Sequence, residues 1–65
     1  MRLNILKLRG VMLREEMTQT DLAEKAGLSR PTVNAICCGR GCKLETGVKI
    51  AEALGVTVEE LRERG

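Results

Sequence analysis

The chain has 65 residues, of which 43% are apolar and 31% charged, and its formal net charge is +2. This length suits one small domain, which buries about 60% of the surface that its unfolded form exposes. The chain contains no His, Phe, Tyr or Trp, which excludes imidazole catalysis and aromatic stacking of single-stranded bases. No apolar run approaches the roughly 20 residues of a membrane span, and no secretory signal is recognisable, so we expect a cytoplasmic protein.

Basic residues are unevenly distributed along the chain. Residues 1–14 and 25–43 contain bases but no acids, whereas the segment from residue 44 onwards has five acids against three bases. The bases of the first two segments are Arg2, Lys7, Arg9, Arg14, Lys25, Arg30, Arg40 and Lys43. The distribution is compatible with a surface that faces a polyanion, and chance clustering on a solvated surface is the alternative for any one segment.

The first predicted helix spans about residues 4–16. Its apolar residues recur at three- and four-residue steps and are Ile5, Leu8, Val11 and Met12. Gly10 weakens this helix by up to about 1 kcal/mol relative to Ala. Residues 2–8 also alternate briefly between polar and apolar, so a short extended N-terminal segment remains an alternative.

Three hydroxyl residues mark the starts of later helices. Each follows an apolar residue and precedes another by four positions, as in a hydrophobic staple around an N-cap. The three sets are Met17–Thr18–Leu22, Leu28–Ser29–Val33 and Val56–Thr57–Leu61. Thr57 and Glu60 also predict a capping box. The expected helix-closing residues are Gly27, Gly39 and Gly55, and Pro31 falls in a first turn, where its missing N–H is harmless.

These signals predict an all-α single domain, residues 1–65, with five short helices. Their expected bounds are about 4–16, 18–26, 29–38, 44–54 and 57–63. The predicted inward-facing residues after the first helix are Leu22, Ala23, Ala26, Val33, Ile36, Cys37, Leu44, Val48, Ala51, Leu54 and Leu61. Only Gly27 and Leu28 separate the second and third helices, which predicts the sharp corner of a helix-turn-helix.

The three cysteines, Cys37, Cys38 and Cys42, are an odd number without a secretory signal, so we expect reduced thiols. Three thiolates and no His leave a tetrahedral zinc site one ligand short. We therefore expect no cofactor and no metal. A thiol-based metal or redox sensor is the less favoured alternative.

The segment 17–33 (MTQTDLAEKAGLSRPTV) resembles the phage repressor and Cro (XRE-type) helix-turn-helix family, which has a lambda-repressor-like DNA-binding domain. The resemblance covers about residues 4–61. The residues that carry it are Thr18, Gln19, Leu22, Ala23, Ala26, Gly27, Leu28, Ser29, Thr32, Val33, Ile36 and Gly39, then Leu44, Glu45, Thr46 and the run 50–57.

The chain departs from this family at two positions that change together. Family members often place an Arg seven residues before the glutamine and a Glu late in the third helix, which pair as a buried salt bridge. Here the two positions hold Met12 and Cys37. Replacing both charges by apolar groups is often neutral, whereas losing one costs about 3–5 kcal/mol. We expect Met12 and Cys37 to touch in the core, and Gly47, which is smaller than the usual family residue, to allow close helix packing.

The resemblance implies that the third helix, residues 29–38, enters the major groove of double-stranded DNA. Arg30 suits guanine O6 and N7, and Asn34 suits adenine or a phosphate. The remaining expected contacts are Pro31 and Ala35 with apolar base edges, and Gln19, Thr32, Arg40 and Lys43 with the DNA backbone. The structural alternatives are that Gln19 caps its helix, that Asn34 is merely solvated, and that Arg30 pairs with Glu24 or with an acid elsewhere.

The sequence therefore favours a sequence-specific DNA-binding transcriptional regulator, with repression as the favoured mode. A homodimer on a palindromic operator, with half-sites roughly 34 Å apart, would supply the binding energy. The main alternative is an antitoxin-like protein-interaction module, and a protein partner cannot be named. We expect no enzyme, because no nucleophile and base can be paired, and no membrane protein, because no apolar run is long enough to span a bilayer.

Overall fold

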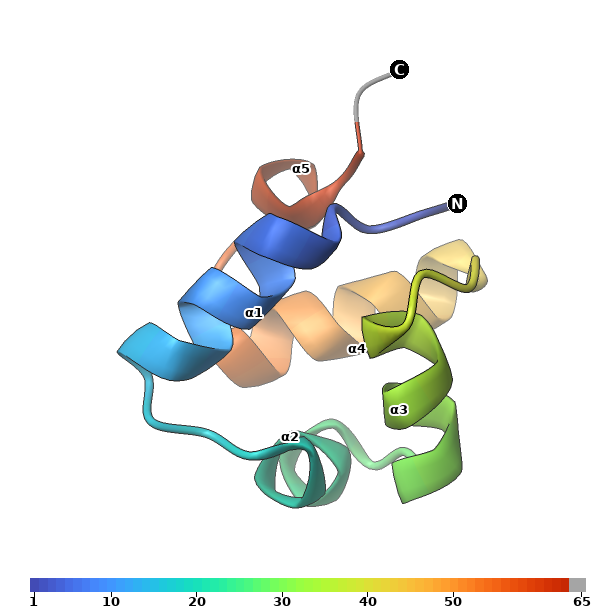
Figure 1. Ribbon diagram of the computed structural model, residues 1–65. Coiled ribbons are helices and arrows are strands. Elements are labelled where there is room, and N and C mark those ends of the chain that lie inside the picture. Colours follow the sequence, from blue (N-terminus) through green and yellow to red (C-terminus); the bar gives the residue numbers. More distant parts are fainter. Residues whose placement is uncertain (64–65) are drawn as a thin grey trace.

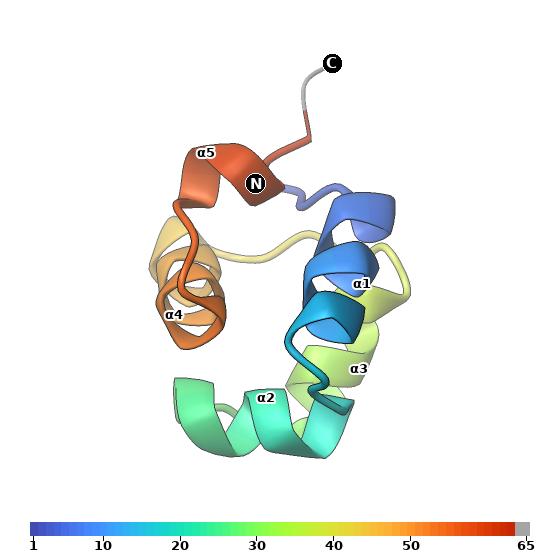
Figure 2. The same ribbon diagram turned by 90° about the vertical axis from the view of Figure 1, so that its left-hand side faces the viewer.

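The computed structural model describes residues 1–63 and confirms the predicted all-α fold. The five helices are α1 (Ile5–Arg14), α2 (Gln19–Ala26), α3 (Arg30–Cys37), α4 (Leu44–Leu54) and α5 (Val58–Leu61). Helix α2 packs against α3 and α4, α1 packs against α3 and α5, and α4 packs against α5. Helices α2 and α5 lie at opposite ends of the domain (Figures 1 and 2). None of the helices in the described part of the chain has the length and apolarity that a bilayer crossing requires.

The three predicted hydroxyl caps are confirmed. Side-chain oxygens of Thr18, Ser29 and Thr57 accept the amide N–H three residues on, at 3.1, 3.3 and 3.3 Å. Because an N-cap residue is itself non-helical, α2, α3 and α5 each begin one residue later than expected. Asn4 caps α1 in the same way, with its Oδ1 3.1 Å from the Lys7 amide.

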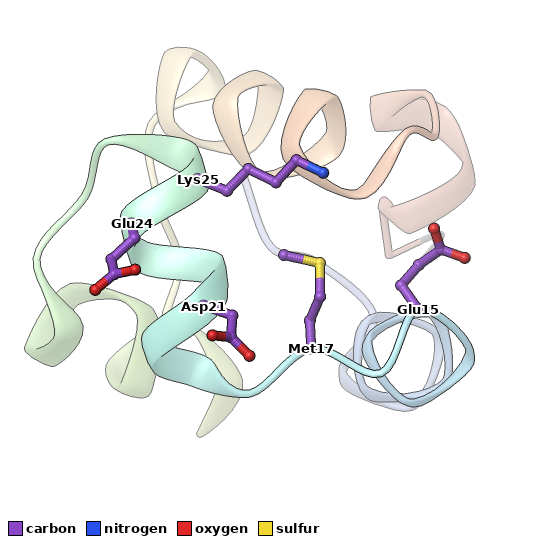
Figure 3. A pocket seen from close by; sticks show the side chains of 5 residues that line it. All are labelled: Glu15, Met17, Asp21, Glu24 and Lys25. Carbon is purple, nitrogen blue, oxygen red and sulfur yellow. The ribbon is translucent and has the colours of Figure 1, made fainter.

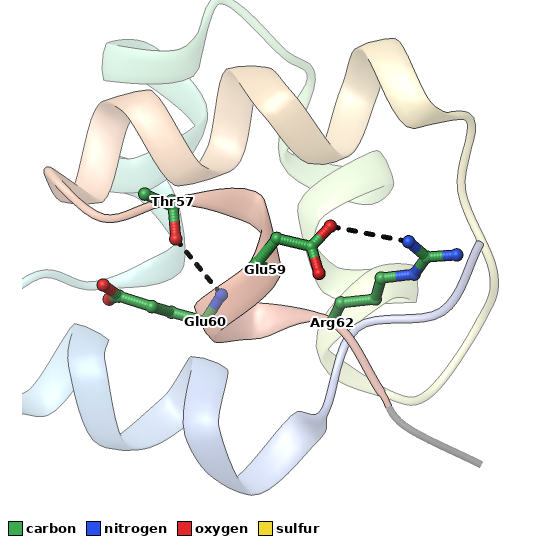
Figure 4. Close-up of polar contacts among 4 residues, drawn as sticks. All are labelled: Thr57, Glu59, Glu60 and Arg62. Carbon is green, nitrogen blue, oxygen red and sulfur yellow. Dashed lines mark hydrogen bonds and ion pairs between the residues drawn. The ribbon is translucent and has the colours of Figure 1, made fainter.

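The predicted capping box at Thr57 and Glu60 is wrong. The Glu60 N–H donates to Thr57 Oγ1, but within residues 1–63 the exposed Glu60 carboxylate makes no bond back to the Thr57 amide (Figure 4). The neighbouring Glu59 carboxylate instead pairs with Arg62 at 3.5 Å. A complete box occurs at α2, where Thr18 Oγ1 accepts the Asp21 N–H and Asp21 Oδ2 accepts the Thr18 N–H at 3.0 Å.

The ends of α2, α3 and α4 follow the predicted glycines, and α3 ends one residue earlier than expected, at Cys37. The ends predicted for α1 and α5 are wrong, and α5 ends at Leu61 instead of residue 63. Gly27, Gly39 and Gly55 have φ values of 71°, 101° and 72°. Helix α1 ends at Arg14, two residues earlier than expected, because Glu16 adopts the left-handed conformation at φ 55°. The Met17 amide then donates back to the Met12 carbonyl at 2.8 Å. The sequence does not mark this helix end, because glycine is the usual residue in a left-handed conformation and the residue here is a glutamate.

The core contains aliphatic and sulfur-containing side chains. Its buried members are Leu3, Leu8, Met12, Leu22, Ala23, Val33, Ile36, Cys37, Ile50, Ala51, Ala53, Leu54 and Leu61. Met12 and Cys37, the two positions at which the sequence departs from the family it resembles, are 7% and 1% exposed. The inward orientation predicted for Leu44 and Val48 is wrong, because they are 62% and 37% exposed. The buried face of α4 is turned away from them and runs along Gly47, Ile50, Ala51, Ala53 and Leu54.

The segment before α1 is extended, as the brief alternation in residues 2–8 allowed, but it stops at Asn4 because residues 5–8 belong to α1. Leu3 forms an antiparallel bridge with Arg62, and the Met1 carbonyl accepts the Cys42 N–H at 2.8 Å. A Cβ on Gly47 would lie 3.0 Å from Met1 Sδ and 3.5 Å from Val58 Cγ2. The expected close approach at Gly47 is therefore confirmed, but the nearest group is the side chain of Met1, and Val58 of α5 is the next nearest residue.

Replacing Glu16 by Gly is expected to stabilise the domain. A residue with a Cβ pays roughly 1–2 kcal/mol to adopt the left-handed conformation, and Gly avoids this cost. The greater conformational entropy of Gly in the unfolded chain offsets part of that gain in stability. We expect Glu16→Gly to raise the free energy of unfolding by about 0.5–1 kcal/mol, measured by urea denaturation. Glu15→Gly, at φ −87°, removes a carboxylate from the same helix end and should not stabilise. Equal effects of the two variants would contradict this explanation.

Asp21 should make stability depend on pH. The hydrogen bonds from the backbone N–H and the hydroxyl of Thr18 lower the pKa of the Asp21 carboxyl. A pKa lowered by folding adds stability at neutral pH, which is lost as the pH falls below about 4 and through the lowered value. We expect Asp21→Asn to be less stable than the unaltered chain at pH 7 and to approach it at pH 3. The matched control is Glu24→Gln, which removes a carboxylate outside the capping box; a similar pH profile for both variants would refute the assignment.

Candidate nucleic-acid interface

The corner between α2 and α3 consists of Gly27, Leu28 and Ser29. The left-handed Gly27 reverses the chain, and the Leu28 N–H donates to the Ala23 carbonyl at 2.9 Å, which closes α2. Leu28 packs against the core, and Ser29 then caps α3. Figure 1 views α2 along its axis while α3 stands upright beside it, so the two helices cross steeply. This is the predicted helix-turn-helix geometry.

Helix α3 buries one face and exposes the other. Val33, Ile36 and Cys37 are at most 3% exposed. On the other side Arg30, Pro31, Thr32 and Asn34 are exposed, and Ala35 is half-buried. Pro31 lies in the first turn, as expected. The residues predicted to read bases therefore share an accessible helix face, with Ala35 at its margin.

The predicted alternative for Arg30, an ion pair with Glu24, is not formed. The ion pairs found within residues 1–63 are Arg14 with Glu15, Lys49 with Glu45 and Arg62 with Glu59. Each joins residues close in sequence on an exposed surface. Arg30, Arg40 and Lys43 take no part in them, so no carboxylate in the described chain neutralises these three side chains through an ion pair.

A hollow lies between α3 and the start of α4. It is lined by Thr32, Ala35, Ile36, Arg40, Gly41, Cys42, Lys43 and Thr46. The structure thus gathers four of the expected DNA contacts from α3 and the loop that follows. Two cations and two hydroxyls border this hollow and no carboxylate does, which suits an anion. Thr46 was not predicted as a contact, although its Leu44-Glu45-Thr46 run was part of the family resemblance.

Gln19 lies apart from this group, at the first position of α2. It is half-buried and lines a second hollow with Arg9, Met12, Leu13, Met17, Thr18 and Cys37. The capping role belongs to Thr18, so the alternative that Gln19 caps its own helix is not what the structure shows. The second hollow borders α3 at Cys37, whereas the first borders it at Thr32, Ala35 and Ile36.

A third hollow, on another side of α2, has the opposite charge. Glu15, Asp21, Glu24 and Lys25 surround Met17 there (Figure 3). Three carboxylates against one ammonium group repel a polyanion. The side of α2 shown in Figure 3 is therefore unsuited to nucleic acid.

The thiols are not assembled into a site. Cys37 is buried and Cys42 is half-buried, and burial raises the pKa of both; the Arg9 charge opposes this for Cys37 and the N-terminal ammonium opposes it for Cys42. A raised pKa lowers the fraction of reactive thiolate. Cys38 is exposed. Across residues 1–63, no three metal-ligating side chains gather into a group, so the structure adds no support for a thiol sensor.

The comparisons with known proteins agree with this geometry. A model of the Cro/C1-type helix-turn-helix DNA-binding domain matches residues 7–64. The restriction-modification controller protein C.AhdI from Aeromonas hydrophila is 30% identical, with a TM-score of 0.81 and 86% of each chain covered. A mutant of the restriction-modification controller protein C.Esp1396I is 28% identical, with a TM-score of 0.76, and the match covers 82% of this chain and 70% of that one.

This chain is also similar to a small part of a larger protein. The Streptomyces albus protein HEPD, solved with 2-hydroxyethylphosphonate and Fe(II) bound, is 37% identical with a TM-score of 0.79, and the match covers 86% of this chain but 13% of HEPD. The likeness is therefore confined to a small part of that protein. No curated protein matches the chain.

Proposed function

The chain belongs to the Cro/C1-type helix-turn-helix DNA-binding family, and from this premise we propose that it represses transcription by placing α3 in the major groove of an operator. Membership of the family and the likeness to the controller proteins make it a DNA-binding transcriptional regulator. The observation that carries the proposal is the exposed face of α3, which is opposite a face that is at most 3% exposed. A protein bound at an operator excludes other proteins from that DNA, which is the simplest way for one small domain to regulate.

Base readout is assigned to the first half of α3. Arg30 has a planar fork that matches guanine O6 and N7, and Asn34, one turn later, can bond adenine N6 and N7. Pro31 and Ala35 offer apolar contact, for example to a thymine methyl group. The exposure of Arg30 and its absence from the ion pairs of residues 1–63 support this assignment.

Backbone contacts are assigned to groups on both sides of α3. Thr32, Arg40 and Lys43 line the hollow between α3 and α4, and Gln19 lies at the start of α2, where free amide groups favour an anion. Contacts of this kind fix the position of the protein on the duplex without reading sequence. We also assign Thr46 to this group because it lines the same hollow.

Two substitutions separate base readout from backbone contact. We expect Arg30→Ala to cost about 1–3 kcal/mol on the preferred duplex and to relax the preference at one base pair. Lys43→Ala should weaken all duplexes alike and reduce the salt dependence by about one phosphate contact. The measurement is fluorescence anisotropy on a duplex selected from a random pool and on a scrambled duplex, each at two salt concentrations. An equal loss on both duplexes for Arg30→Ala would show that Arg30 is not a base-reading residue.

We further propose a homodimer in which the start of α4 meets its counterpart. Leu44 and Val48 are 62% and 37% exposed, one helical turn apart, and directly follow the loop that carries Arg40 and Lys43. Contact at this place would hold two copies of α3 on successive turns of one duplex face, as two-fold symmetric operators require. Leu6 and Leu13 on α1 are also exposed, at 84% and 80%. They are a second exposed apolar pair, against which the role of Leu44 and Val48 in dimerisation can be compared.

The dimer proposal is tested by removing equal numbers of exposed apolar side chains. Leu44→Ser with Val48→Ser should shift the sedimentation coefficient towards the monomer and weaken binding to a two-half-site duplex more than to a single half-site. Leu6→Ser with Leu13→Ser should leave both measurements unchanged. The proposal fails if the α1 pair has the larger effect.

A further inference from the structure

We infer that Arg9 of α1 is a further phosphate-binding residue of the DNA interface, held in place by the end of α3. The inference rests on the proposed function, because it assigns a ligand group to a residue outside the helix-turn-helix. The Arg9 side chain is exposed on α1, and its Nη2 donates to the Cys37 carbonyl oxygen at 3.3 Å, across 28 residues of sequence. This bond joins α1 to the last residue of α3.

The bond orients the guanidinium group without neutralising it. A carbonyl at a helix C-terminus carries only partial negative charge, and a guanidinium group has five N–H donors, of which this bond uses one. The Cys37 side chain beside it is a buried thiol whose pKa is raised by burial, so it supplies no negative charge. Among residues 1–63, Arg9 belongs to none of the ion pairs, and residues 1–14 contain no acid.

The surroundings of Arg9 point to phosphate as the ligand. Arg9 lines the same hollow as Thr18 and Gln19 at the start of α2, so a phosphate group in this hollow would meet Arg9 and Gln19 together. A guanidinium fork pairs with two phosphate oxygens at once, which a backbone contact of the duplex provides. Gln19 alone is a neutral donor, and Arg9 adds the full charge that the interface otherwise lacks on this side.

The position of Arg9 also adds a cation on a second side of α3. The hollow with Arg40 and Lys43 borders α3 at Thr32, Ala35 and Ile36, and the hollow with Arg9 borders it at Cys37. A helix in the major groove, which is about 12 Å wide, has a phosphate backbone on each side. With Arg9 included, cationic side chains border α3 on both sides.

The test compares Arg9→Ala with Lys7→Ala, which removes the same charge from an exposed position of the same helix. Binding is measured with the selected and scrambled duplexes over a range of salt concentrations. We expect Arg9→Ala to lose about tenfold in affinity for both duplexes and to reduce the slope of log K against log salt by about 0.9. Lys7→Ala should lose less than about twofold because an exposed charge away from the duplex is screened.

Arg9→Lys keeps the charge but loses the fork, and circular dichroism at the binding temperature checks that each variant is folded. We expect Arg9→Lys to keep the salt slope of the unaltered chain while losing part of the affinity. Equal losses for Arg9→Ala and Lys7→Ala, with the unaltered chain binding the duplex, would overturn this inference alone. Failure of the unaltered chain to bind any duplex would overturn the proposed function and this inference together.

Discussion

The position of α3 depends on the backbone conformation of Gly27. Its φ of 71° lies in the left-handed region, and a Cβ added there would meet nothing within 4 Å. The requirement is therefore for a conformation and not for space. It allows α2 to end, Leu28 to reach the core and Ser29 to cap α3 within three residues. A residue that cannot adopt this conformation cheaply would change the angle between the two helices.

Burial then decides which face of α3 is presented. Val33, Ile36 and Cys37 pack into the core, so Arg30 and Asn34 are left on the outside. The core achieves this without an aromatic side chain and without the charged pair common in the family, since Met12 and Cys37 are both buried. Two apolar groups at these positions avoid the cost of desolvating two charges. The guanidinium group that meets the end of α3 comes instead from Arg9 and binds the backbone carbonyl.

The charges of the domain are divided between its sides. Cations border the hollow between α3 and α4 and, through Arg9, the hollow at the start of α2. Carboxylates of Glu15, Asp21 and Glu24 gather around Met17 on another side of α2 (Figure 3). The net charge is only +2, but the attraction of a duplex depends on the local arrangement of charges. The positive potential around α3 is therefore stronger than the net charge alone suggests.

The sequence by itself determined the features that depend on neighbouring residues. The caps at Thr18, Ser29 and Thr57, the left-handed glycines, the corner after α2 and the inward face of α3 follow from side chains at most four positions apart. That reach is the range of helix capping and of helical periodicity. The exposed face of α3 was predictable for the same reason, whereas the DNA contacts assigned to it rest on the family resemblance.

Only the tertiary structure decided the features that join distant segments. The burial of Gly47 under Met1 and the bond from Arg9 to the Cys37 carbonyl connect residues 46 and 28 positions apart, and neither leaves a local pattern. The exposure of Leu44 and Val48 was missed because an apolar stripe on α4 has two candidate faces, and packing against its neighbours selects one. Periodicity states that a helix has an apolar face, but the rotation of that helix about its axis is fixed by the surfaces it packs against.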